Sequence, residues 1–421
     1  MKKMLAMVLA AALLLGMMSF AQADDPITVT FWNGWTGSDG DVLIEMVDEF
    51  NRTNPDNIHI EMDINADFQT KIAATFAADE GPDMILGAHS YKDTYPEYLI
   101  DMNEVFEKTS LKKDDFIKGY IDLCSKDGIL YVVPFQVTGR YLYWNKDLFE
   151  AAGLDPDVPP ASYEEWEEMA EKITNPDMNV YGSGISYNAI YTNLQVIQRM
   201  GGLFVDHDEA GNLVPTFAKD GVVNAGYAKF LDWFKRMTDN EVNPIEADTT
   251  SMFQAGQIGI MPDGAWASAG ADNAGINYGV SQLPYGDAGA MNPCSVSGFS
   301  ITKYASEEKK LAAMKFIEWW HNGFDTTETT ACLTWSLRCG FPGYYLPAIN
   351  DERYQASQKL AMMTNTDNSA STTYMAPDDF TFTFQLASEV IEVMVEDVIV
   401  GGMDTEAALL KAEEGAEALL K

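Results

Sequence analysis

The chain has 421 residues, more than one compact hydrophobic core usually organises and enough for two. It carries 64 acidic and 27 basic residues, a formal net charge of −37, which argues against binding to nucleic acid or to an anionic membrane surface. With 47% hydrophobic and 12% aromatic residues, it is expected to be a folded, globular protein.

The first residues have the pattern of an export signal. Two lysines precede an apolar run over 4–18, and small residues follow it up to Ala23. The run of about 15 residues is shorter than the roughly 20 that a membrane-spanning helix needs. We expect residues 1–23 to be a signal peptide cleaved near Ala23. No cysteine lies there to carry a lipid, so the mature protein is expected to be soluble and periplasmic.

The mature sequence opens with a strand, a helix and a second strand. Apolar and threonine side chains alternate over 27–31, which is typical of a strand with one buried face. Ser38 and Asp41 have the spacing of a capping box at the start of a helix, and Pro55 ends it. A second strand is predicted over 58–62. Such a strand–helix–strand unit favours a parallel sheet covered by helices.

The alternation of strands and helices continues along the chain. We predict helices over 68–79, 162–173, 306–320 and 404–420, strands over 84–87, 129–134, 141–144 and 258–261, and a loop over 364–373. Ser162 with Glu165 should cap one of these helices. The segment 206–211 is predicted as a hairpin turn rather than a calcium loop, because Ala210 and Phe217 stand at two ligand positions. The pattern as a whole predicts an α/β protein.

The sequence contains four cysteines: Cys124, Cys294, Cys332 and Cys339. In an oxidising compartment they could form a disulfide, and the last two are nearest in sequence. Four cysteines allow three full pairings, so the sequence does not fix the connectivity. None lies in a C-x-x-C arrangement, which argues against zinc and thioredoxin-like chemistry.

Sequence motifs of catalysis are missing. No Gly–Lys pair of a phosphate-binding loop, no G-x-S-x-G elbow and no H-E-x-x-H motif occurs, and the four histidines are not at metal-ligand spacing. Carboxylates are too plentiful for a glycosidase pair to be singled out. We therefore expect a binding protein rather than an enzyme, with no metal and no cofactor.

Aromatic and polar side chains follow several predicted strands. In an open α/β sheet, ligands bind beyond the carboxyl ends of the strands, and a flat indole face suits the C–H face of a sugar ring. Side chains in such positions are Trp32, Trp35, His89, Gln136, Tyr187, Asn188, Tyr191 and Trp266. They predict a polar cleft with aromatic platforms for a carbohydrate. Packing in the core remains the alternative for each tryptophan taken singly.

Five segments, in this order and spacing, resemble the extracellular solute-binding proteins of ABC importers, the group that contains maltose- and oligosaccharide-binding proteins. Each segment is weak evidence alone, but their order is specific. They are ITVTFWNGWTG at 27–37, GPDMIL at 81–86, ILYVVPFQVTGRYLYWNKDLFEAAGLD at 129–155, FQAGQIGIMPDGAW at 253–266 and SGFSITKYASEEKKLAAMKFIEWW at 297–320.

The resemblance implies the periplasmic binding protein type II fold, with two discontinuous α/β lobes joined by a hinge. The lobes would comprise 24–137 with 299–340, and 138–298 with 341–421. The chain would cross between them near 136–141, 295–300 and 340–347. Binding residues implied by matching positions are Trp32, Trp35, Gln136, Gly264, Trp266, Gly298, Phe299 and, beside the third crossing, Arg338.

The function implied by the resemblance is that of a periplasmic substrate-binding subunit. As a monomer, it would capture a sugar or oligosaccharide by hinge closure and deliver this small-molecule ligand to the transmembrane subunits of an ABC permease. No nucleic acid partner is expected. One alternative is a binding protein for a polyamine or other non-sugar solute, whose cleft would need several carboxylates. Another is a secreted polysaccharide-degrading enzyme, with two opposed carboxylates within about 10 Å.

Overall fold

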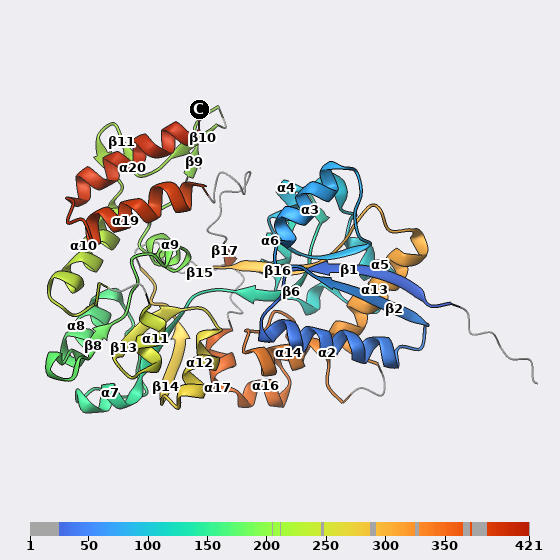
Figure 1. The fold of residues 1–421 in the computed structure, drawn as a ribbon, viewed down its shortest axis with the longest axis horizontal. Helices are drawn as coiled ribbons and strands as arrows, with labels where there is room; N and C mark the ends of the chain where they lie inside the picture. The colour runs from blue at the N-terminus through green and yellow to red at the C-terminus, as the bar shows by residue number, and fades with distance from the viewer. Residues whose placement is uncertain are drawn as a thin grey trace, which may run out of the picture.

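The computed structural model of the protein describes residues 25–203, 205–210, 212–245, 248–286, 292–324, 328–364, 371–372 and 385–420. The predicted signal peptide, 1–23, lies outside the described residues. Figure 1 shows two α/β lobes side by side, with extended segments running between them. Among the described helices, none is both long and apolar enough to span a bilayer.

The first lobe is built on a five-stranded sheet of order β2-β1-β3-β16-β6. Its strands are β1 (Ile27–Asn33), β2 (Ile58–Ile64), β3 (Met84–Ala88), β6 (Val133–Thr138) and β16 (Ser295–Ile301). Strand β1 runs parallel to β2 and β3, whereas β16 runs antiparallel to both β3 and β6. The carboxyl ends of β1, β2, β3 and β6 therefore lie at one edge of the sheet.

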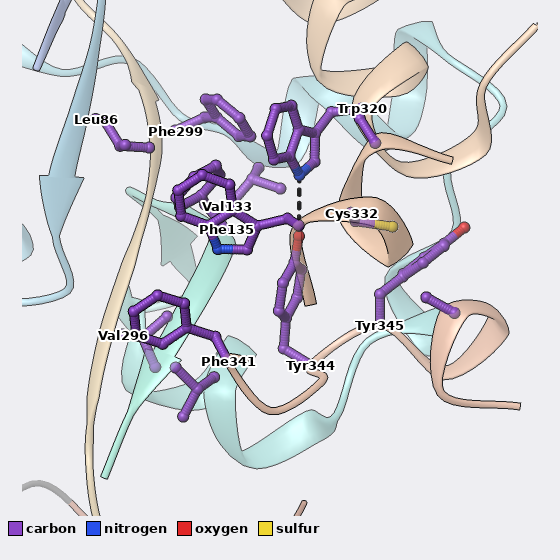
Figure 2. Packing of buried hydrophobic residues seen from close by; sticks show 14 of the residues in the cluster. Leu86, Val133, Phe135, Val296, Phe299, Trp320, Cys332, Phe341, Tyr344 and Tyr345 are labelled. Atoms are coloured by element: carbon purple, nitrogen blue, oxygen red, sulfur yellow. Dashed lines mark hydrogen bonds between the residues drawn. The ribbon is translucent and has the colours of Figure 1, made fainter. Parts of the chain in front are cut away.

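Helices on both faces cover this sheet (Figure 1). They are α2 (Ser38–Thr53), α3 (Phe68–Ala77), α4 (Tyr91–Thr94), η1 (Pro96–Tyr98), α5 (Asn103–Lys108), η2 (Lys113–Asp115), α6 (Lys118–Leu123), α13 (Glu307–Asn322) and α14 (Ala331–Cys339), with a small ribbon of β4 (Ser125–Lys126) and β5 (Ile129–Leu130). An aromatic core fills the space between sheet and helices, where Phe135 and Phe299 pack against Trp320. Figure 2 shows this packing and the hydrogen bond that Trp320 donates to Tyr344.

The second lobe is built on a four-stranded sheet of order β14-β7-β13-β8. Its strands are β7 (Tyr141–Asn145), β8 (Tyr181–Ser183), β13 (Ile258–Asp263) and β14 (Tyr278–Gln282). Strand β7 is antiparallel to β13 and β14, and β13 is parallel to β8. Tyr141, the first residue of β7, pairs with Asp263 at the end of β13 on one side and with Gln282 at the end of β14 on the other. One edge therefore holds the carboxyl ends of β8, β13 and β14 together with the amino end of β7.

The helices and hairpins of the second lobe come from distant parts of the chain. They are α7 (Lys146–Ala151), α8 (Tyr163–Ile173), η3 (Pro176–Met178), α9 (Ile190–Arg199), α10 (Ala225–Asp239), α11 (Thr249–Gln254), α12 (Ala267–Ala274), η5 (Leu386–Ile391), α19 (Glu392–Ile399), α20 (Thr405–Leu419) and the hairpins β9 (Val205–His207) with β10 (Leu213–Pro215) and β11 (Ala218–Lys219) with β12 (Val222–Val223). Within the hairpin predicted at 206–211, residues 206–207 end β9, which pairs with β10, and residue 211 lies outside the described residues.

Three stretches of chain pass between the sheets. The first is Gly139–Arg140, between β6 and β7, and the second runs from β14 to β16 through β15 (Asn292–Pro293). The third follows α14 through α15 (Leu346–Ile349) and α16 (Glu352–Ala356) to α17 (Gln358–Met363). Helix α17 packs against β14, where Gln282 Nε2 donates to the Met363 carbonyl at 2.7 Å.

Some predicted elements differ from the structure. Residues 371–372 form a short strand, β17 (Ser371–Thr372), which pairs with β15, so the loop prediction is wrong there. The capping box at Ser38 is also wrong, because the N-cap of α2 is Gly37, which has no side chain to accept a bond. The cap of α8 is confirmed: Ser162 Oγ accepts from the Glu165 N–H at 3.1 Å.

All four cysteines lie in described segments and are free thiols. Cys332 and Cys339 lie on the same helix, α14. Seven residues of helix separate their Cα atoms by about 10 Å along its axis, beyond the roughly 7 Å that a disulfide spans. The pair nearest in sequence therefore cannot be bridged in this fold.

Candidate functional site

The two sheet edges meet at the first crossing. Strand β6 ends at Thr138 and β7 begins at Tyr141, so Gly139–Arg140 joins the edge formed by strand carboxyl ends in the first lobe to the corresponding edge in the second. Loops beyond strand carboxyl ends are where open α/β sheets bind ligands. The region around this crossing is therefore the candidate site.

One exposed aromatic ring at this edge belongs to Trp266, just past β13. Its side chain is 46% exposed to solvent. The ring lies directly against Gly264, because a Cβ on that residue would come within 2.3–2.4 Å of the indole Cζ2, Cη2 and Cζ3 atoms. The guanidinium of Arg140 lies 4.7 Å from the centroid of the indole ring. The indole is thus held in place yet open to solvent.

Arg140 connects the first crossing to helix α9 through two hydrogen bonds. Its backbone N–H donates to Gln195 Oε1 at 2.9 Å, and its Nε donates to Thr192 Oγ1 at 2.8 Å. The residue is only 9% exposed. Arg140 lies in the segment 129–155, which resembles the solute-binding proteins, but it was not among the predicted site residues. The sequence did contain a signal for it: Arg140 is a charged residue directly after Gly139, inside the crossing predicted near 136–141.

The residues predicted near 187 gather at the amino end of α9, close to Arg140. Asn188 is exposed, and its Oδ1 accepts from Ser186 Oγ at 2.6 Å. Tyr187 is half-buried and packs against the core of the second lobe. Tyr191 is half-buried too. Burial raises the pKa of Tyr191, which the nearby charge of Arg140 partly offsets and that of Glu392 reinforces, so its hydroxyl is a neutral donor at pH 7.

On the first lobe, the two predicted tryptophans lie in different surroundings. Trp35 follows β1, donates its backbone N–H to Asn33 Oδ1 and meets Phe135 edge-on, with ring centroids 6.0 Å apart. The ring of Trp32 is covered by a cation, since Lys71 Nζ lies 3.7 Å from its centroid. Lys71 is held there by Asp63 at 2.6 Å. That face of Trp32 is therefore already occupied.

His89 and Gln136 lie at the correct edge, but their polar atoms are engaged inside the lobe. His89 Nδ1 accepts from the Val296 N–H at 3.2 Å. Burial, followed by the charge of Lys92, lowers the pKa of His89 to about 4. Gln136 Oε1 accepts from Trp335 Nε1 at 3.2 Å.

Three other predicted site residues have contacts of their own within the first lobe. Phe299 is 0% exposed and belongs to the aromatic core in Figure 2. Gly298 serves close strand packing, because a Cβ there would lie 2.1 Å from the Val133 carbonyl oxygen. Arg338 pairs with Glu45 across α14 and α2, where both line a hollow of about 500 Å³.

Two buried polar side chains that the sequence did not single out belong to the same region. Asn33, at the carboxyl end of β1, and Gln195, on α9, are both 0% exposed. Within the described part of the chain, Asn33 Nδ2 and Gln195 Nε2 have no hydrogen-bond partner. Leaving a buried donor unpaired costs about 1–3 kcal/mol, which marks both amides as places for a water or a ligand atom.

Comparisons with known proteins bear on these observations. A family model described as bacterial extracellular solute-binding protein matches residues 45–361. The sn-glycerol-3-phosphate-binding periplasmic protein UgpB of Brucella abortus is 23% identical over 333 residues, 70% of each chain. The maltotriose-binding protein of Pyrococcus abyssi is 24% identical over 336 residues, 77% of this chain and 68% of that one.

Among solved structures, the sugar-binding protein MalE of Xanthomonas citri superposes with a TM-score of 0.77 at 20% sequence identity. The match covers 93% of this chain and 97% of that chain. The expected fold class, two α/β lobes of the periplasmic binding protein type II kind, is therefore confirmed.

Proposed function

The chain belongs to the family of bacterial extracellular solute-binding proteins, and from this premise we propose that it captures a sugar or oligosaccharide for an ABC importer. It acts in the periplasm, without catalysing a reaction, and hands its ligand to the transmembrane subunits of a permease. The described helices include none that could anchor it in the bilayer by spanning it. Two relatives named above bind small organic solutes, maltotriose and sn-glycerol 3-phosphate.

One observation carries the proposal that the ligand is carbohydrate-like: the placement of Trp266. A half-exposed indole at the carboxyl end of β13 costs hydrophobic free energy unless something covers it. A sugar ring covers such a face and leaves its hydroxyls at the rim, where Asn188 and Tyr191 can bond to them.

Binding proceeds by hinge closure. Contacts from both lobes to one ligand exist only when the two sheet edges approach, so the ligand shifts the population towards the closed form. The residues of the first lobe that would meet Trp266 across the ligand are Asn33 and Trp35, at the end of β1.

A polyamine fits this site less well than a sugar. The guanidinium of Arg140 stands at the crossing and repels a cation. The described carboxylate at the end of β13, Asp263, already accepts from Thr250 Oγ1 and from the Gly264 N–H, both at 2.6 Å. A polyamine site needs several carboxylates free to face the ligand.

A thermal-shift and calorimetric screen tests the proposal. The panel holds mono- and oligosaccharides, sugar and polyol derivatives, and spermidine. We expect a carbohydrate or a derivative of one to raise the melting temperature, since a ligand that binds only the folded state stabilises it. Trp266→Ala should weaken that binding at least tenfold, and Trp266→Phe should restore part of it. Stabilisation by spermidine alone would overturn the proposal.

A further inference from the structure

Strand β2 forms an outer edge of the five-stranded sheet of the first lobe. In the order β2-β1-β3-β16-β6, its one neighbour among the described strands is β1. An edge strand offers backbone N–H and C=O groups to which a strand of another molecule can add. The outer side of β2 is therefore a surface through which two copies of the chain can associate, unless something closes it.

Two asparagine side chains of the preceding helix occupy this outer side. Asn51 Oδ1 accepts from the Ile60 N–H at 2.7 Å, and Asn51 Nδ2 donates to the Ile60 carbonyl oxygen at 3.0 Å. Asn54 Oδ1 accepts from the Ile58 N–H at 2.9 Å, and Asn54 Nδ2 donates to the Ile58 carbonyl oxygen at 2.8 Å. Each side-chain amide thus satisfies both backbone groups of one strand residue, as the backbone of a neighbouring strand would.

The end of α2 has the spacing and direction that this pairing requires. Residues three apart on a helix lie about 5–6 Å from each other, close to the distance of about 6.6 Å between alternate residues of a strand. The order is reversed, since Asn54 meets the first residue of β2 and Asn51 meets the third. Asn54 is also held from the helix side, because its Nδ2 donates to the Phe50 carbonyl oxygen at 2.9 Å. The helix end therefore imitates an antiparallel neighbour of β2.

The sequence of β2 offers little other protection to its first half. Proteins commonly keep edge strands apart with proline, lysine or a β-bulge. Strand β2 contains neither proline nor lysine, and its register with β1 is continuous. Its exposed carboxylates, Glu61 and Asp63, lie in the second half of the strand. The two asparagine amides cover the first half.

We propose that Asn51 and Asn54 keep this edge of the sheet closed to a second copy of the chain. With both amides in place, an incoming strand must break four hydrogen bonds before it forms its own. Without them, Ile58 and Ile60 offer their backbone groups, and two copies pair edge to edge through β2. This inference does not rest on the proposed function.

The mass of the double variant Asn51→Ala, Asn54→Ala in solution tests the proposal. Light scattering after size exclusion and sedimentation velocity measure it over a range of protein concentrations. The measurements are made in high sodium chloride, which screens the repulsion between copies that each carry a formal net charge of −37. We expect the mean mass of the variant to at least double over a range in which the mass of the parent stays constant.

A matched control separates this effect from the loss of any asparagine. Asn273 is an exposed asparagine of α12, in the second lobe. Asn273→Ala should therefore behave as the parent does. Circular dichroism and the melting temperature establish that each variant is folded. If the double variant does not fold, Asn51→Ala takes its place, because Asn54 still bonds to the end of α2.

Hydrogen exchange locates the contact. The Ile60 amide should exchange at least tenfold faster in dilute Asn51→Ala than in the parent, because its acceptor is gone. In the associated double variant, the amides of Ile58 and Ile60 should become slow again, since a strand of the second copy now accepts from them.

Two outcomes overturn the proposal. If the folded variant keeps a constant mass over the whole range, the amides only stabilise the turn between α2 and β2. If the variant associates but the amides of Ile58 and Ile60 stay unprotected, the copies meet at another surface.

Discussion

At the scale of single residues, the site depends on a glycine. The indole of Trp266 occupies the volume in which a Cβ of residue 264 would lie. Glycine is needed at this position because any side chain would collide with the indole. It is not needed for an unusual backbone conformation. Arg140, whose guanidinium lies 4.7 Å from the centroid of the same indole, adds a cation–π contact.

Gly264→Ala should therefore displace the ring of Trp266 while leaving the fold intact. The nine tryptophans give nine indole N–H signals in a two-dimensional nitrogen–proton spectrum. We expect the Trp266 signal, assigned with Trp266→Phe, to move most, and ligand affinity to fall about tenfold. An unmoved signal would show that Gly264 does not position the ring.

Two buried histidines make stability depend on pH. Burial lowers the pKa of His89 and of His321 to about 4, from an ordinary value of 6.5. Below pH 6.5 the unfolded chain binds protons at both residues while the native state does not, so stability is lost as the pH falls from 6.5 to 4. Each histidine contributes on the order of 3 kcal/mol to this loss.

Urea unfolding at pH 7.5 and at pH 5 measures the effect. The free energy of unfolding should be lower at pH 5. His321→Gln should reduce the difference between the two values, even if the variant is less stable overall, because one titrating group is gone. A difference that is unchanged in this variant would contradict the assignment to His321.

At the scale of elements, local patterns were enough to predict some of the strands and helices. Alternation placed β1, and the spacing of Ser162 and Glu165 placed the start of α8. Pairings between distant segments were not predictable in this way. The strand at Ser371–Thr372 exists through its pairing with Asn292–Pro293, and nothing in either dipeptide indicates the other.

The same distinction applies to the site. Position after a strand correctly placed Trp266 at a sheet edge, but it could not reveal that Lys71, from another element, covers Trp32. Phe299 was assigned to the site by its position at a crossing, yet the direction of its side chain was decided by the aromatic core behind the sheet. Arg140 was missed because its partners, Thr192 and Gln195, lie more than 50 residues away.

The cap of α8 gives a prediction at this scale. Ser162→Ala removes the acceptor for the Glu165 N–H and should lower the free energy of unfolding by about 1 kcal/mol. Ser162→Asp keeps an acceptor and should restore most of the loss. Denaturant unfolding of the three proteins measures both changes, and an alanine variant as stable as the parent would show that the bond contributes nothing.

At the scale of the whole molecule, the two lobes are not independent cores. One cluster of buried residues contains Phe135 and Phe299 of the first sheet together with Tyr143 and Met261 of the second. Residues after α14, among them Tyr344 and Tyr354, belong to the same cluster. Their packing joins the lobes beside the crossings.

We therefore expect the lobes to unfold together. In differential scanning calorimetry without ligand, a single transition should appear, with the calorimetric and van't Hoff enthalpies nearly equal. Two resolved transitions would show that the shared cluster does not couple the lobes. Adding a ligand that bridges the lobes should raise the midpoint of the transition without splitting it.

The exposure of Trp266 has an optical consequence. All nine tryptophans lie in described segments, and Trp266 is the one whose side chain is among the exposed large hydrophobic groups. Its emission should dominate the long-wavelength side of the fluorescence spectrum and should be the first quenched by iodide or acrylamide. A ligand lying on the indole would shift that emission to shorter wavelength and protect it from the quencher. Ligand binding can therefore be followed by the protein's own tryptophan fluorescence.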